Sequence, residues 1–249
     1  MSLNVAAYHF VAIDDPQTLA EQCRERAEAA AVLGTILIAG EGINLVLAGE
    51  ESSLRAFIAD LLADPRFASM RPKYSVSDAV PFARLKVKVK SEIISFRQEN
   101  SQPLDNMRAP ALAAADLARW IAQGHDDAGR RLLLLDTRNR EEVQYGSFAN
   151  AITLGIDNFT ELPQAIGPQL DSLGDAAVVS FCTGGVRCEK AALWLRKQGL
   201  DHVWQLDEGI LGYFEQVGGA GYDGACFVFD ERVALTPDLK PINAQPKNQ

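Results

Sequence analysis

Apolar runs alternate with amphipathic stretches in the first part of the chain. Residues 5–13 form an apolar, β-branched and aromatic run that predicts a strand. Helical spacing of apolar residues predicts a helix over residues 16–33 that buries Cys23 on its packing face and stops at Gly34. Further strands are predicted at residues 35–39, 43–48, 74–76 and 85–89, and a second helix, capped by Ser52 or Ser53, at residues 54–62. This order of elements predicts a ferredoxin-like α+β sandwich.

The second part of the chain alternates short apolar runs with helical segments. Strands are predicted at residues 132–135, 151–154, 178–181 and 203–206, and helices at residues 111–123, 141–145, 162–173, 189–197 and 209–217. Nearly all-apolar runs are typical of parallel strands that are buried on both faces. The alternation therefore predicts a parallel α/β sheet, which binds ligands beyond the carboxyl ends of its strands.

Length and composition bound the class of protein. A chain of 249 residues is long enough for two domains. The polar stretch at residues 98–109 predicts a linker, so we expect domains at residues 1–97 and 110–235 and a flexible C-terminal tail at residues 236–249. Hydrophobic residues make up 47% and charged residues 23%, values typical of a globular protein.

Targeting signals, cysteine spacing and net charge indicate where the protein acts and which partners it can bind. The N-terminus lacks a signal-peptide pattern and no apolar run reaches membrane-spanning length, so we expect a cytoplasmic protein without membrane contact. The four cysteines are too scattered for a disulfide scaffold and show no zinc-site spacing. The net charge of -9 argues against unspecific affinity for nucleic acid. Any polyanionic partner must therefore bind a local basic patch.

The strongest chemical signal is a cysteine loop between a predicted buried strand and a predicted helix. Cys182 opens this loop, which continues with Thr183, Gly184, Gly185, Val186, Arg187 and Cys188. Backbone N–H groups of such a loop and of the helix that follows favour an anion at its centre. Because Arg187 adds a positive charge, we predict an anion-cradling loop with Cys182 as a catalytic thiolate. The alternative is that both cysteines are small buried hydrophobic residues.

Residues around the loop have plainer interpretations. Asp136 and Arg138 follow a predicted strand, and we expect them to support the loop through capping and hydrogen bonds. Cys188 either resolves an oxidised Cys182 as a disulfide or has a structural role.

Other classes of site are not indicated. The three histidines, His9, His125 and His202, are isolated, so we predict no metal site. Gly184 and Gly185 lack the third glycine of a dinucleotide-binding turn.

A strictly alternating segment in the first domain carries a row of positive charge. Leu85, Val87 and Val89 are expected to face the core, which leaves a basic row on the other face, composed of Arg84, Lys86, Lys88 and Lys90. Such a row suits a phosphate backbone. Equally, lysines on a solvated edge strand discourage pairing with other sheets.

Motifs along the chain together resemble a known family. Residues 133–138 (LLLDTR), the cysteine loop and residues 207–210 (DEGI) resemble a rhodanese domain. With EGIN at residues 41–44, LKVK at residues 85–88 and FVFDER at residues 227–232, the chain is similar to the rhodanese-type tRNA uridine hydroxylases. One departure is Ser147, which stands where rhodanese domains usually have histidine.

The resemblance implies both a fold and an activity. The expected fold is α/β: an N-terminal ferredoxin-like α+β sandwich of the acylphosphatase type, followed by a rhodanese-like parallel-sheet α/β domain. The implied activity is hydroxylation of the wobble uridine of tRNA to 5-hydroxyuridine, with prephenate as cosubstrate and no bound cofactor. Cys182 matches the family's catalytic position, and tRNA is the implied partner. Two alternatives stay open: a sulfurtransferase that carries a persulfide on Cys182, and a rhodanese-like module that only binds a partner. The oligomeric state and the tRNA species stay open as well.

Overall fold

The structure is a computed structural model that describes residues 1–99, 101–104 and 108–242. The described residues divide into two compact units. The N-terminal unit comprises Met1–Ser95 and a returning segment, Phe229–Val233, and the C-terminal unit comprises Phe96–Val228 and Ala234–Ile242. Each unit has its own hydrophobic core, as expected of a domain. The returning segment lies within the range that the sequence assigned to the second domain.

The N-terminal unit is built on a five-stranded sheet of order β4-β1-β3-β2-β5. Its elements are β1 (Ser2–Phe10), α1 (Pro16–Ala29), β2 (Leu33–Ala39), β3 (Gly42–Gly49), α2 (Glu51–Leu62), a 3-10 turn (Pro65–Phe67), β4 (Lys73–Ser77) and β5 (Leu85–Val89). The first four strands pair antiparallel in the order of a ferredoxin-like sandwich, which confirms the prediction. β5 is an addition that pairs parallel with β2 at the edge of the sheet.

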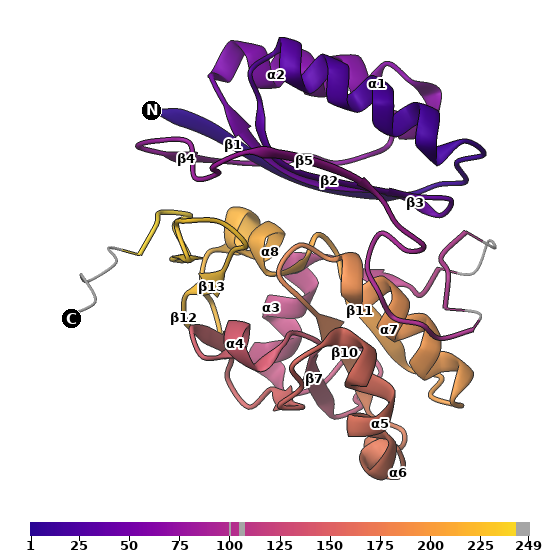
Figure 1. The fold of residues 1–249 in the computed structure, drawn as a ribbon. Helices are drawn as coiled ribbons and strands as arrows, with labels where there is room; N and C mark the ends of the chain where they lie inside the picture. The colour runs from indigo at the N-terminus through magenta and orange to yellow at the C-terminus, as the bar shows by residue number, and fades with distance from the viewer. Residues whose placement is uncertain (100, 105–107, 243–249) are drawn as a thin grey trace. The chain divides into compact units, whose positions relative to one another are not determined.

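Both helices of this unit lie over the same face of the sheet (Figure 1). Alternate residues of each strand point toward them, because side chains alternate across a strand. Ile36 and Ile38 of β2, Leu45 and Leu47 of β3, and Leu54 of α2 are at most 1% exposed. Burying each such side chain contributes roughly 1.5–3 kcal/mol, so this face supplies the core.

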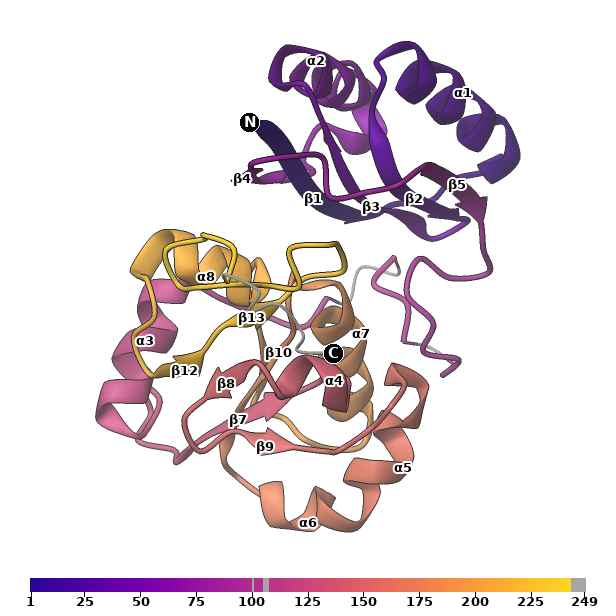
Figure 2. The ribbon, with the colours of Figure 1, turned by 60° about the vertical axis from the view of Figure 1, so that its left-hand side comes forward.

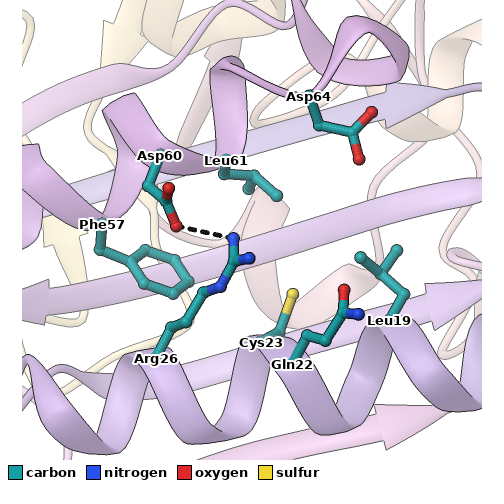
Figure 3. Close-up of a pocket in the computed structure, with 8 residues that line it drawn as sticks. All are labelled: Leu19, Gln22, Cys23, Arg26, Phe57, Asp60, Leu61 and Asp64. Carbon is teal, nitrogen blue, oxygen red and sulfur yellow. Dashed lines mark hydrogen bonds and ion pairs between the residues drawn. The ribbon is translucent and has the colours of Figure 1, made fainter.

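A pocket of about 250 Å³ lies between α1 and α2 (Figure 3). Cys23 of α1 points its sulfur into the pocket, and Arg26 reaches Asp60 of α2 across it at 2.6 Å. The buried position of Cys23 confirms that it lies on a packing face. Burial raises the pKa of Cys23 to about 11, so this thiol is protonated at neutral pH.

Two helix boundaries of this unit differ from the prediction. α1 ends at Ala29, and Gly34 lies inside β2 at a φ of 129°. A Cβ on Gly34 would lie 2.2 Å from the Val46 carbonyl oxygen, so glycine permits the close strand pairing instead of ending the helix. The cap of α2 is Glu50, whose carboxylate accepts the Ser53 N–H at 2.9 Å, and not a serine.

The C-terminal unit is built on a five-stranded sheet of order β6-β11-β10-β7-β9, in which all pairs are parallel. Its strands are β6 (Ala111–Leu112), β7 (Leu132–Asp136), β8 (Gly146–Phe148), β9 (Ile152–Thr153), β10 (Ala177–Phe181), β11 (Val203–Leu206), β12 (Tyr222–Gly224), β13 (Cys226–Phe227) and β14 (Ala234–Leu235). Its helices are α3 (Ala114–Gln123), α4 (Arg140–Val143), α5 (Leu162–Ile166), α6 (Leu170–Leu173), α7 (Val186–Lys197) and α8 (Gly209–Val217), with 3-10 turns at Phe159–Glu161 and Gly167–Gln169. The predicted parallel α/β fold is confirmed.

Helices cover both faces of this sheet (Figure 2). α3 and α8 pack on the face to which Val179 and Phe181 of β10 point. α7 packs on the other face, where the Ser180 hydroxyl donates to the Cys188 carbonyl at 3.3 Å. The carboxyl ends of β10 and β7 are therefore framed by helices on both sides.

Some local predictions for this unit are wrong or incomplete. Residues 111–112 pair with β11 as a short strand, so α3 begins later than predicted. The β8–β12 and β13–β14 ladders were not predicted. In the predicted tail, the Ile242 N–H donates to the Ala234 carbonyl at 3.0 Å, while residues 243–249 lie outside the described residues. Within the predicted linker, residues 100 and 105–107 also lie outside them.

Across the described ranges, no helix combines the length and the apolar character that a membrane span requires.

Candidate active site at the cysteine loop

The cysteine loop lies at the carboxyl edge of the parallel sheet, as the sequence predicted. β10 ends at Phe181 and α7 begins at Val186. Gly185 caps α7 with a φ of 104°, a conformation that favours glycine. Asp136 ends the neighbouring strand β7 and stands in register with Phe181. The topology therefore brings Cys182 and Asp136 to the same edge.

The sulfur of Cys182 is surrounded by hydrogen-bond donors. Cys182 is 0% exposed, and the Gly185 N–H donates to its Sγ at 3.2 Å. Burial alone would raise the pKa of Cys182. The Cys188 thiol, the Arg187 charge and the backbone N–H groups of both residues outweigh that effect and lower the pKa below the ordinary thiol value. Cys182 is thus a thiolate at neutral pH.

Cys188 lies beside Cys182 with the opposite protonation. The two Sγ atoms are 4.0 Å apart, and the Cys188 thiol donates a hydrogen bond to the Gly185 carbonyl oxygen at 2.9 Å. Burial and the neighbouring Cys182 raise the pKa of Cys188 well above the ordinary value. The loop therefore holds a thiolate and a neutral thiol in contact.

Glu142 of α4 holds the loop from the side, and sequence reasoning assigned it no role. Its carboxylate accepts both ends of the Arg187 guanidinium, at 2.5 and 2.6 Å, and the Thr183 hydroxyl at 3.0 Å. Burial opposes the ionisation of Glu142, but Arg187 outweighs it and lowers the pKa of Glu142. Asn139 caps α4 together with Glu142, and this Asn-x-x-Glu pattern was the available signal in the sequence.

Asp136 and Arg138 form a fully buried ion pair below the loop. Arg138 Nη2 donates to Asp136 at 2.6 Å and to the Gly146 carbonyl at 2.7 Å. Thr137, between the two, holds the root of the loop: its hydroxyl donates to the Phe181 carbonyl at 2.9 Å. The ion pair therefore fixes the β7 edge and the start of β8, and Thr137 makes the contact with the loop strand.

The amino end of α8 closes over the loop. The Ile210 N–H donates to the Cys182 carbonyl at 2.9 Å, and the Leu211 N–H donates to the Thr183 carbonyl at 3.1 Å. A Cβ on Gly209 would lie 2.6 Å from both the Cys182 carbonyl oxygen and the Gly185 nitrogen. Because Gly209 of the DEGI segment has no side chain, the amino end of α8 can contact the loop directly.

The basic row lies in the N-terminal unit, on the edge strand β5 and its flanks. The side chains of Arg84, Lys86, Lys88 and Lys90 are all exposed, and within the described residues none of them forms an ion pair. Val87 is buried and Leu85 half-buried, as predicted, but Val89 is 40% exposed because it lies at the open end of this edge strand.

The EGIN segment has a structural explanation. The Glu41 carboxylate accepts the Ile93 N–H at 2.8 Å, and the Asn44 amide donates to the Ile93 carbonyl at 3.2 Å. Together they bind the backbone N–H and carbonyl of Ile93, near the point where the chain leaves the N-terminal unit. Of the described His, Cys, Asp and Glu residues, no three gather in a way that could hold a metal ion.

A parallel sheet with a buried, hydrogen-bonded cysteine loop between strand and helix defines a rhodanese-like domain. Comparison with family models agrees: residues 113–216 match the rhodanese-like domain, and residues 2–93 match the UPF0176 acylphosphatase like domain. Solved structures with local likeness include a rhodanese-related protein of Thermoplasma volcanium, 25% identical with a TM-score of 0.34, covering 43% of this chain and 93% of that one.

Named relatives match both units. A tRNA uridine(34) hydroxylase of Xanthomonas campestris pv. campestris (strain 8004) is 61% identical over 242 residues, which cover 97% of this chain and 95% of that protein. Another, of Xylella fastidiosa (strain 9a5c), is 59% identical over 241 residues, covering 97% and 93%. This chain belongs to the tRNA uridine(34) hydroxylase family.

Proposed function

We propose that this protein hydroxylates the wobble uridine of tRNA to 5-hydroxyuridine, with the Cys182 thiolate as the catalytic group. The observation that carries the proposal is the 61% identity, across both units, to a protein named tRNA uridine(34) hydroxylase. The lowered pKa of Cys182 supports it, because only a thiolate is a strong sulfur nucleophile. Since tRNA is the substrate, the proposal places the enzyme in the cytoplasm.

The loop offers a binding site for an anionic cosubstrate, for which we propose prephenate. Backbone N–H groups turned toward the loop centre stabilise negative charge there. Arg187 forms an ion pair with Glu142. We therefore propose that Arg187 holds the loop in shape and contributes to its electrostatics, and that the backbone N–H groups bind the anion. Cys182 is buried, and Gly184 and Val186 are the half-exposed residues of the loop, so substrates approach from their side.

The basic row is the proposed contact for the tRNA backbone. Its four cations are exposed and, within the described residues, not paired with carboxylates, which leaves them available to phosphates. The outer edge of β5 already has a cap, because Arg24 of α1 donates to the Val87 carbonyl at 2.8 Å. Lysines are thus less needed there to prevent edge pairing, which favours the interpretation as a phosphate-binding row.

Nucleoside mass spectrometry tests the activity directly. The cells compared carry the intact gene, no gene, Cys182→Ser, or Cys23→Ser as a matched control on a buried cysteine of the N-terminal unit. We expect 5-hydroxyuridine with the intact gene and with Cys23→Ser, and its loss in the other two. Unchanged 5-hydroxyuridine without the gene or with Cys182→Ser contradicts the proposal. Cys182-dependent turnover of thiosulfate by the purified protein, without tRNA hydroxylation, would favour the sulfurtransferase alternative.

Salt dependence of tRNA binding tests the basic row separately. Each phosphate contact contributes about 0.7–0.9 to the slope of log K against log salt concentration. Changing Lys86, Lys88 and Lys90 to Gln is therefore expected to lower that slope by about 2–3. Lys197→Gln removes an exposed charge from α7 and serves as the control. An equal slope in the triple variant and the wild type would contradict the proposed phosphate contact and leave β5 as an ordinary solvated edge strand.

A further inference from the structure

Cys182 and Cys188 form a pair of neighbouring cysteines inside the C-terminal unit, and neither is in a disulfide. Both are 0% exposed, and their Sγ atoms are 4.0 Å apart. One residue binds both: Gly185 donates its N–H to Cys182 Sγ at 3.2 Å, and its carbonyl oxygen lies 2.9 Å from Cys188 Sγ. The two sulfurs thus lie close together and share one residue, Gly185, as a hydrogen-bond partner.

We propose that Cys188 is a resolving thiol, which converts a sulfenic acid or a persulfide on Cys182 into a Cys182–Cys188 disulfide. The sulfenic acid forms on Cys182 when its thiolate attacks a peroxide. The persulfide forms when the thiolate attacks a sulfane-sulfur donor such as thiosulfate. Both place a leaving group on Cys182 Sγ, directly beside a second thiol.

The resolving step balances in both cases. Cys188 Sγ attacks Cys182 Sγ, the new S–S bond forms, and the bond from Cys182 to its terminal oxygen or sulfur breaks. The departing hydroxide takes the proton released by Cys188 and leaves as water, and the departing hydrosulfide leaves as hydrogen sulfide. The electrons lost by the two thiols were accepted by the peroxide in the first case. In the second case they reduce the sulfane sulfur to sulfide.

The two sulfurs are close enough to form the bond after a small movement of their side chains. An S–S bond is about 2.05 Å long, so the sulfurs must approach from 4.0 Å, and Cys188 must leave the Gly185 carbonyl. The other cysteines are not candidates: Cys23 belongs to the core of the N-terminal unit, and Cys226 Sγ lies 3.7 Å from the Phe227 carbonyl oxygen, whereas Cys188 is the described cysteine whose sulfur contacts Cys182 Sγ. A protein that discharges its own persulfide is a poor sulfur carrier, which fits an oxygen-transferring enzyme better than a sulfurtransferase.

Intact-mass spectrometry of the full chain tests the proposal. The reduced protein is treated with hydrogen peroxide or with thiosulfate, alkylated, and digested to map disulfides. Wild type is expected to lose about 2 Da and to yield a peptide pair that links Cys182 with Cys188, in both treatments. Cys188→Ser is expected to gain about 16 Da or more with peroxide, and about 32 Da with thiosulfate, on Cys182.

Two controls keep the outcome clear. Cys226→Ser removes another buried thiol of the same unit and is expected to form the disulfide like the wild type, while circular dichroism checks that each variant is folded. Oxygen or sulfur adducts that accumulate on Cys182 to the same extent in folded wild type and Cys188→Ser would overturn the proposal. The assay contains no tRNA, so its result does not depend on whether the protein is a hydroxylase.

Discussion

Gly209→Ala is the sharpest single test of how the loop is held. Gly209 has a φ of 65°, where an L side chain costs about 1–2 kcal/mol. Its new Cβ would lie 2.6 Å from backbone atoms of Cys182 and Gly185, which no side-chain rotation can relieve. The amino end of α8 must therefore move away from the loop.

That movement weakens two hydrogen bonds, from the Ile210 and Leu211 N–H groups to loop carbonyls. At about 0.5–1.5 kcal/mol each, together with the strain at Gly209, the total destabilisation is about 2–5 kcal/mol. For a chain of this size, at about 3 °C per kcal/mol, that lowers the melting temperature by about 6–15 °C. Because the Cys182 backbone shifts too, hydroxylation by the folded variant is expected to fall about 100-fold.

Thermal unfolding followed by circular dichroism, and hydroxylation of tRNA below the melting temperature, measure both effects. Gly40→Ala is the matched control. Gly40 does not have a positive φ, a Cβ there would lie 3.8 Å from the Ile13 carbonyl oxygen, which is an ordinary contact, and it is not part of the site. A Gly209→Ala protein that melts within about 1 °C of wild type and keeps its activity would refute the account of how α8 holds the loop.

Two further predictions concern the charges of the loop. Glu142→Gln leaves the Arg187 guanidinium buried beside a neutral amide, so we expect the free energy of unfolding, measured in urea, to fall by about 3 kcal/mol. Glu141→Gln changes an exposed neighbour and is expected to change that free energy very little. Equal stability of the two variants would contradict the importance of the buried pair. Because its pKa is lowered, Cys182 is expected to react with iodoacetamide at nearly the same rate at pH 6.5 and pH 8. A thiol of pKa near 8.5 would react about 20 times faster at the higher pH. A rise that steep, seen in the wild type and absent in Cys182→Ser, would show that Cys182 is an ordinary thiol and would contradict the prediction.

The cysteine loop was predictable because its information is contiguous. The buried strand before Cys182, the glycines and the helix after Val186 all lie within a short window, and local patterns predict each of them. The contacts that tune the loop are not local. Glu142 precedes Arg187 by 45 residues, and no periodicity in the sequence relates the two.

Errors in the fold prediction arose where tertiary contact overrides local preference. Gly34 looks like a helix stop, yet its actual constraint is the approach of Val46 on the neighbouring strand. Residues 111–112 continue an alanine-rich helical pattern, yet they pair with β11 because the sheet edge offers unpaired backbone groups. The strand order of the N-terminal unit followed correctly from the order of its elements, and the added β5 pairing with β2 did not.

Ser147 shows how a departure from a family pattern can leave a site intact. Its hydroxyl donates to Asp136 Oδ2 at 2.7 Å, on the same carboxylate oxygen that accepts Arg138 Nη2. A histidine there would titrate near neutral pH and change the charge beside the ion pair, whereas a hydroxyl donates at every pH at which the protein is folded. Ser147 therefore supports the ion pair beneath Cys182 without adding a side chain that titrates near neutral pH.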